Sequence, residues 1–316
     1  MSRSRLGRVA LWVTGVGTTA VAGVLVTRYV DREALHAAWV EMRADPVGLT
    51  VAMGAYVAAF VVRGAIWKRM LPSLQLGHAV AAIHLTLLGN HVLPFRLGEP
   101  LRAASVTARA GVPIGPAIAS TVAMRAADIL GVAVLGLVLG PGIVVSLLGP
   151  WGLALMTAGA LAVGVAGVWW LRRRYGSLSP LGFVRMPGPV VAIGALAAWV
   201  LESAVMWQSA RWVGFPITPG AAVVATAITV GAQIAALAPA GFGTFEAAGT
   251  AALAAVGMPA GRALAVTLTV HAVTTVYSLV TGAVALVLPS PAMRPSLLLR
   301  ALRSPHPADL AAGAGP

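Results

Sequence analysis

Cysteine is absent from this chain of 316 residues, and lysine occurs once, at Lys68. Without cysteine the protein can form no disulfide bond, no thiolate metal site and no cysteine nucleophile. Charged residues make up only 10% of the chain, whereas a soluble domain usually carries about 25%. The chain also lacks a G-x-x-x-x-G-K-[ST] loop and an H-E-x-x-H helix, which are the signatures of a nucleotide P-loop and of a zinc protease. We therefore expect neither a soluble enzyme of these classes nor a bound metal ion or cofactor.

Long apolar runs take the place of the missing charge. Hydrophobic residues form 59% of the chain, and several runs reach the ~20 residues that a helix needs to cross the hydrocarbon core of a bilayer. The sequence therefore predicts an all-α polytopic membrane protein. Its six full spans are expected near residues 9–27, 47–66, 113–139, 151–171, 189–210 and 263–288.

The first apolar run has two interpretations. A basic start, an apolar centre and the small-x-small sequence Ala20-Val21-Ala22 are also typical of a cleaved signal peptide. The apolar run continues through Val26, however, and further spans follow it. We therefore expect an uncleaved first span.

Two further regions, 77–110 and 219–256, are apolar and long but interrupted. A non-helical break within a membrane is tolerated only where it is buried in protein or lines a watery cavity. We therefore expect two re-entrant hairpins, each made of two short helices. The breaks fall at Pro94 and Gly98 in the first region and at Pro239, Gly241 and Gly243 in the second.

The net charge of +13 does not indicate a nucleic-acid partner. The arginines lie at the ends of the apolar runs rather than in one patch, as expected of positive-inside topology signals. With both hairpins re-entrant, most basic residues fall on the side of the N-terminus. We therefore predict a plasma-membrane protein with both termini cytoplasmic, one transmembrane bundle over residues 1–288, and a disordered basic tail over residues 289–316.

A weak internal repeat relates the two halves of the bundle, about 9–140 and 151–288. Residues 111–119 read GVPIGPAIA and residues 257–265 read GMPAGRALA. Three full spans separate the two hairpins, so the second copy is predicted to be inverted in the membrane, as in many secondary transporters. The alternative is an accidental match of Gly/Pro turns in a chain rich in glycine and alanine.

Charged residues stand within the predicted spans, where each is expensive and by default marks a functional site. Arg125 and Asp128 are three residues apart on one helix, so we expect them to pair; the alternative is that this pair only orients helices. His271 lies at the position equivalent to Arg125 in the second copy, although a lone histidine is more often a satisfied core group. Glu202 is a further intramembrane carboxylate, either a proton-coupling group or a partner for an arginine.

The broken hairpins carry a second polar set. Free N–H groups at the starts of the short helices, together with arginines, favour an anionic group. Glu99 and Glu246 fall in the first turns of the helices that follow the breaks, where we expect them to cap the helices and hold the arginines in place. The expected headgroup-binding residues are Asn90, Arg96, Gly98, Glu99, Arg102, Arg125, Asp128, Gly241, Gly243, Glu246 and His271.

Three segments resemble the motifs of a known family: NHVLPFRLGE (90–99), MRAADILG (124–131) and PAGFGTFE (239–246). They are similar to the lysylphosphatidylglycerol synthase transmembrane-region family, also described as flippase-like and typified by the membrane half of the multiple peptide resistance factor. The resemblance covers about residues 47–288 and implies site residues among those named above, together with Pro94 and Pro239. Members fused to a cytosolic synthase domain make aminoacylated phosphatidylglycerol and move it across the membrane. Residues 289–316 are too few for that domain, so we do not expect synthase activity here.

The expected function is therefore that of a lipid flippase or scramblase and not of an enzyme. Its substrate would be an anionic phospholipid, an aminoacyl-phosphatidylglycerol-like lipid or a polyprenyl-phosphate-linked glycolipid. One alternative is a non-transporting, lipid-binding partner of a separate glycosyltransferase or lipid-modifying synthase. A second, an integral-membrane transferase, is disfavoured because the carboxylates serve better as caps and ion-pair partners than as paired catalytic acids.

Overall fold

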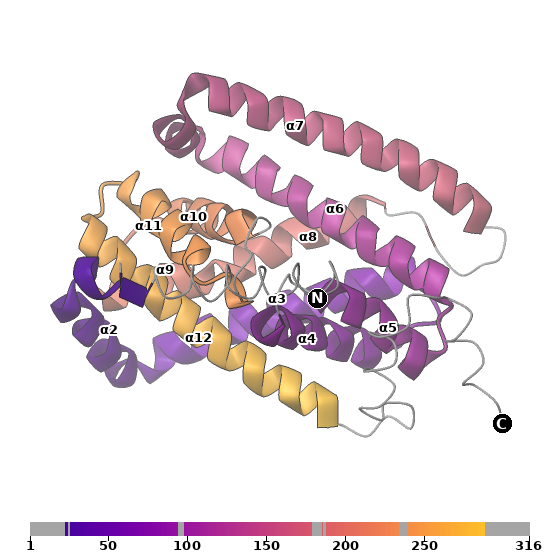
Figure 1. Ribbon diagram of the computed structural model, residues 1–316, viewed down its shortest axis with the longest axis horizontal. Coiled ribbons are helices and arrows are strands. Elements are labelled where there is room, and N and C mark those ends of the chain that lie inside the picture. The colour runs from indigo at the N-terminus through magenta and orange to yellow at the C-terminus, as the bar shows by residue number, and fades with distance from the viewer. Residues whose placement is uncertain are drawn as a thin grey trace, which may run out of the picture.

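The computed structural model describes residues 23–24, 26–93, 98–178, 185, 188–233 and 239–287, and every regular element in this part of the chain is a helix (Figure 1). The elements are α2 (Arg32–Ala44), α3 (Pro46–Met70), α4 (Leu76–Val92), α5 (Gly98–Ala110), α6 (Ile114–Leu139), α7 (Pro141–Leu178), α8 (Pro189–Glu202), α9 (Ala204–Trp212), α10 (Pro219–Ala232), the short 3-10 helix η4 (Pro239–Gly241), α11 (Thr244–Ala254) and α12 (Ala260–Val287).

Within the described residues, four helical stretches are long and apolar enough to cross a membrane. They are α3, α6, α12 and the consecutive pair α8–α9, and they coincide with four of the predicted spans. A fifth candidate lies in α7, where Pro141–Leu155 and Thr157–Gly167 meet at 41°. The predicted span 9–27 lies almost wholly outside the described residues, and the predicted tail 289–316 lies wholly outside them.

The outer surface of the bundle is apolar, as membrane lipid requires. In the most apolar 18 residues of each of these four candidate spans, only 28–39% is buried inside the protein. Side chains such as Val138, Leu155 and Val287 point outward with 70%, 73% and 80% of their surface exposed. Because lipid solvates such side chains, this exposure is expected of a bundle that is embedded in a bilayer.

Both predicted interruptions are confirmed. The first separates α4 from α5, and the second separates α10 from α11, with η4 between them. In the second break Ala240, Gly241 and Gly243 have φ angles of 57°, 74° and 87°. This left-handed backbone conformation is accessible to glycine without steric cost, and it turns the chain so that α11 can begin.

Helices α4 and α5 pack together in unusually close contact at Gly98. A Cβ atom at this position would lie 2.2 Å from the carbonyl oxygen of Thr86 and 2.5 Å from Oδ1 of Asn90. Only glycine therefore allows the first turn of α5 to rest against the last turns of α4. This contact places Glu99, the next residue, beside the centre of the bundle.

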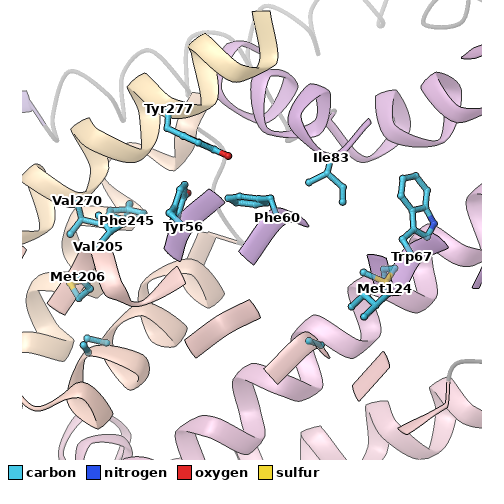
Figure 2. Close-up of a cluster of buried hydrophobic side chains, with 14 of the residues drawn as sticks. Tyr56, Phe60, Trp67, Ile83, Met124, Val205, Met206, Phe245, Val270 and Tyr277 are labelled. Carbon is cyan, nitrogen blue, oxygen red and sulfur yellow. The ribbon is translucent and has the colours of Figure 1, made fainter. Parts of the chain in front are cut away.

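Much of the core lies where α3 packs against α4, α8 and α9. Tyr56 and Phe60 of α3 pack edge to face at 5.0 Å between ring centroids, and Tyr277 of α12 lies 5.0 Å from Tyr56 (Figure 2). Trp67, also on α3, is fully buried. Tyr56 and Phe60 also form part of the wall of the polar site described next.

Candidate functional site

A cavity of about 130 Å³ lies at the centre of the bundle. This volume holds several water molecules. Its wall is made by both broken regions, α4–α5 and α10–η4–α11, and by the helices α3, α6, α8, α9 and α12. The polar side chains in the wall are Arg63, Thr86, Asn90, His91, Glu99, Arg102, Arg125, Asp128, Glu202, Thr226, Thr229, Gln233, His271 and Thr274.

Arg63 of α3 is the centre of the first ionic cluster. Its Nη1 donates to Oε2 of Glu202 at 2.6 Å, and its Nε lies 3.4 Å from Oδ1 of Asp128. The three side chains are only 8%, 11% and 10% exposed. The guanidinium carbon also lies 5.0 Å from the centre of the Trp199 ring. Arg63 therefore ties α3 to α6 and α8 through two buried ion pairs and an aromatic contact.

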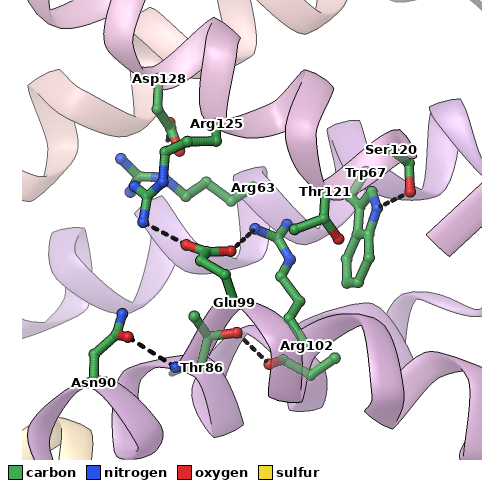
Figure 3. Close-up of polar contacts among 12 residues, drawn as sticks. Arg63, Trp67, Thr86, Asn90, Glu99, Arg102, Ser120, Thr121, Arg125 and Asp128 are labelled. Atoms are coloured by element: carbon green, nitrogen blue, oxygen red, sulfur yellow. Dashed lines mark hydrogen bonds and ion pairs between the residues drawn. The ribbon is translucent and has the colours of Figure 1, made fainter. Parts of the chain in front are cut away.

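The predicted pair between Arg125 and Asp128 is wrong. Nη2 of Arg125 pairs with Oε1 of Glu99 on α5, whereas Asp128 pairs with Arg63 (Figure 3). The two residues do share one face of α6, but opposite charges on the neighbouring helices α5 and α3 lie closer to each. Of the two roles considered for Glu202, the structure shows the partner of an arginine.

Glu99 also faces Arg102, so its predicted role of holding arginines is confirmed. Oε2 of Glu99 is 3.9 Å from Nη1 of Arg102. The guanidinium carbon of Arg102 lies 4.1 Å from the centre of the Trp67 ring, and Nε1 of Trp67 donates to Oγ of Ser120 at 3.0 Å. Although Arg102 is 6% exposed, its Nε and Nη2 have no hydrogen-bond partner among the described residues. Buried donors of this kind normally have partners, which makes Arg102, a residue of the cavity wall, a candidate ligand contact.

The second broken region carries a similar pair. Oε2 of Glu246 accepts a hydrogen bond from the Gly243 N–H at 2.6 Å, which confirms the predicted cap of α11. Oε1 of Glu246 pairs with Nδ1 of His271 on α12. The imidazole stacks on Phe245, with 4.4 Å between the ring centroids. His271 lines the cavity, while Glu246 lies behind it and is 3% exposed.

An amide side chain bridges each break. Oδ1 of Asn90 accepts from the Gly98 N–H at 3.0 Å, which joins the end of α4 to the start of α5 (Figure 3). Nε2 of Gln233 donates to the carbonyl oxygen of Ala240 at 2.9 Å, joining the end of α10 to η4. These bonds satisfy backbone groups that the breaks leave without helical partners.

Most predicted site residues meet at this cavity. Asn90, Glu99, Arg102, Arg125, Asp128, Glu202, Gly241 and His271 line it, whereas Gly98, Gly243 and Glu246 lie at the starts of α5 and α11. Arg96 and Pro94 lie outside the described residues.

Sequence reasoning missed Arg63, which is not among the headgroup-binding residues expected from the sequence. The available signal was its spacing. Tyr56, Phe60, Arg63, Trp67 and Met70 recur at intervals of three and four residues, and all five are buried. Arg63 thus belongs to the inward face of α3.

The model of the lysylphosphatidylglycerol synthase TM region matches residues 12–282, which is most of the chain. The chain belongs to this family. This family membership confirms the resemblance seen in the three sequence motifs, and it agrees with the apolar helical bundle.

A curated relative matches part of the chain. Glycosyltransferase AglD of Haloferax volcanii is 31% identical over 169 residues, which is 52% of this chain and 26% of the relative. The chain therefore spans about a quarter of the length of that protein. No solved structure matches the chain.

Proposed function

We propose that this membrane protein binds the headgroup of an anionic lipid in the central cavity and carries the lipid across the bilayer, as a flippase or scramblase. The observation that supports this most directly is the position of Arg102: a buried guanidinium at the cavity wall with two N–H-bearing nitrogens that have no partner among the described residues. A guanidinium edge of this kind suits a phosphate group.

The environment of the cavity supports the same proposal. A lipid headgroup must pass a hydrocarbon core about 30 Å thick, where an uncompensated charge is costly. The Arg125 and Glu99 side chains keep 35% and 26% of their surface exposed, whereas the Arg63 cluster is almost closed. Arg125 and Glu99 are therefore accessible groups that can exchange partners with a headgroup, while the Arg63 cluster holds the surrounding helices.

The proposal includes an inverted repeat, which the packing supports. Helix α4 packs against α12, and α10 packs against α6, so each broken region lies against the last long helix of the other half (Figure 1). The two Glu–base pairs have nearly the same separation in sequence: 26 residues for Glu99 and Arg125, and 25 for Glu246 and His271. Such repeats allow a central site to face either side in turn.

The finer assignments also belong to the proposal. We infer six spans and two re-entrant hairpins in one bundle over residues 1–288, in the plasma membrane and with both termini cytoplasmic. Aminoacyl-phosphatidylglycerol-like lipids and polyprenyl-phosphate-linked glycolipids both carry the phosphate that Arg102 would recognise. The bundle itself is proposed to be non-catalytic, because its cavity carboxylates Glu99, Asp128 and Glu202 are each placed beside an arginine.

A second candidate function follows from the relative named a glycosyltransferase. In this alternative the cavity holds a lipid for a separate glycosyltransferase or lipid-modifying enzyme without moving it across the membrane. Lipid would then bind in the cavity, but the two leaflets would not exchange it.

The test is lipid exchange in vesicles. The full chain is reconstituted into phosphatidylcholine vesicles that contain a trace of fluorescent phosphatidylglycerol, and probe in the outer leaflet is quenched with dithionite. We expect exchange with the wild-type chain and at least about a tenfold slower rate for Arg125→Gln or Arg102→Gln, since each change removes a charge-assisted hydrogen-bond donor from the cavity. Arg262→Gln is the matched control, because Arg262 pairs loosely with Asp31 at 3.9 Å outside the cavity and is 46% exposed.

The outcomes separate the candidates. Exchange by the wild-type chain that is lost in the cavity variants and kept in the control supports the flippase. Co-purified anionic lipid without exchange supports the non-transporting partner. Equal exchange rates in all variants would show that the cavity is not the route.

A further inference from the structure

The two Glu–base pairs of the cavity differ in one chemical respect. Glu99 pairs with Arg125, and Glu246 pairs with His271. An arginine stays protonated at every physiological pH, so the Glu99–Arg125 pair keeps a net charge of zero. Histidine is the side chain whose charge normally changes between about pH 5 and 8. The Glu246–His271 pair can therefore gain or lose a proton where its counterpart cannot.

The geometry shows where that proton would bind. Nδ1 of His271 faces Oε1 of Glu246, so in the neutral ring Nδ1 carries the hydrogen and donates it to the carboxylate. The other carboxylate oxygen is held by the Gly243 N–H at 2.6 Å. Nε2 of His271 then has an unprotonated lone pair. It is buried, it has no partner among the described residues, and it belongs to a ring in the cavity wall.

The other groups around the cavity do not compete for this role. Among the helices packed against α12, α11 carries Glu246 and α4 carries three histidines. His78 and His84 lie outside the cavity wall, and His84 bonds to Tyr277, whereas His91 lines the cavity with its Nδ1 bonded to the Leu87 carbonyl. Helix α9 contributes only apolar side chains to the wall, and α2 contributes none. Across the cavity, each carboxylate lies beside an arginine and each arginine beside a carboxylate. The carboxylates are Glu99, Asp128 and Glu202, and the arginines are Arg63, Arg102 and Arg125.

We propose that His271 and Glu246 form a proton-binding site that couples lipid transport to protons, so that one proton enters the cavity with each anionic headgroup. This proposal rests on the proposed flippase function. Protonation at Nε2 changes the charge of the pair from −1 to zero and turns a lone pair into an N–H donor on a ring of the cavity wall. Both changes favour a phosphate group, and by linkage a bound phosphate favours the proton equally.

The direction of coupling follows from these signs. Because the proton and the anionic headgroup bind to the same state of the cavity, they cross in the same direction. A proton taken from the acidic side is released to the alkaline side, and no group is oxidised or reduced. The combined transfer moves no net charge when the headgroup carries a single negative charge.

A pH gradient across vesicles tests the coupling. The full chain is reconstituted into phosphatidylcholine vesicles with a trace of fluorescent phosphatidylglycerol, and a gradient of one pH unit is imposed. We expect the probe to accumulate in the leaflet that faces the alkaline side, with an upper limit of about tenfold for one-to-one coupling, since one pH unit is one tenfold step in proton activity. A protonophore should abolish the accumulation.

Two variants fix the pair in opposite states. His271→Arg creates a permanently charged pair like that of Arg125, and His271→Gln keeps a polar side chain that cannot be charged. Neither variant should accumulate the probe in response to the gradient, even if it still exchanges lipid between the leaflets. His36→Gln is the control, because His36 is an exposed histidine on α2 and should respond like the wild type. Accumulation that persists in both His271 variants, or follows His91→Gln instead, would overturn the assignment.

A direct titration separates this proposal from the proposed function. The chain is labelled with ¹⁵N-histidine in lipid nanodiscs, and the His271 signal is identified by its loss in His271→Gln. We expect this signal to change with pH, and the change to differ between phosphatidylglycerol and phosphatidylcholine because a bound headgroup and the proton are linked. A signal that does not titrate refutes the proton site, even if lipid exchanges. A titrating signal in a chain that exchanges no lipid refutes the flippase and the coupling, while the proton-binding site stands.

Discussion

Removal of Arg63 should destabilise the protein more than removal of any exposed arginine. In Arg63→Met the carboxylates of Asp128 and Glu202, which are 10% and 11% exposed, lose the charge between them. Breaking a buried ion pair from one side typically costs about 3–5 kcal/mol, because an uncompensated charge stays buried. The contact with the Trp199 ring, 5.0 Å from the guanidinium carbon, is lost as well.

The comparison is made with an exposed ion pair. Arg262→Gln breaks a contact of 3.9 Å whose side chains are 46% and 35% exposed, so solvent screens the charges and the cost should stay below about 1 kcal/mol. Thermal unfolding of the purified chains in detergent provides the measurement. We expect the apparent melting temperature of Arg63→Met to fall by roughly 5–15 °C and that of Arg262→Gln to change little.

A triple variant decides whether charge or packing causes the loss. In Arg63→Met/Asp128→Asn/Glu202→Gln no charge is left unpaired, so most of the stability should return. If the single variant melts like Arg262→Gln, the three residues do not form a buried network. If the triple variant is no more stable than the single variant, lost packing rather than unpaired charge is the cause.

Three further predictions concern topology, packing and Arg96. Ser146→Cys should react with an impermeant thiol reagent in intact cells, whereas Ser73→Cys should react only after permeabilisation; the opposite pattern would invert the proposed topology, and no native cysteine interferes. Gly98→Ala should lower the free energy of unfolding by about 1–3 kcal/mol through overpacking, because its Cβ would lie 2.2 Å from a backbone oxygen, whereas Gly54→Ala, with open space around it, should be neutral or stabilising. Arg96→Gln is expected from the sequence to keep the fold and strongly reduce exchange of fluorescent phosphatidylglycerol; a wild-type rate would exclude Arg96 from the headgroup site.

Hydropathy, proline and glycine carried most of the information about the fold. Lipid selects apolar runs of sufficient length, so the spans around residues 47–66, 113–139 and 263–288 were predictable without knowledge of their neighbours. The breaks were predictable for a similarly local reason, since glycine and proline act on the backbone of their own segment. The cap at Glu246 also depends on a single helix start and was predictable, whereas Glu99 lies in the first turn of α5 as expected but the Gly98 N–H is bonded by Asn90 instead.

The partners of the charged residues were decided by tertiary structure. Arg125 and Asp128 share one helix face, and a sequence shows no more than that. Whether they bond to each other depends on which charges the facing helices present, and here α5 offers Glu99 while α3 offers Arg63. Arg63 shows the same limit, because its place three residues from Phe60 and four from Trp67 becomes meaningful only when that face of α3 is known to point inward. Ion pairs between helices depend on helix rotation and distance, and no local pattern in the chain specifies either quantity.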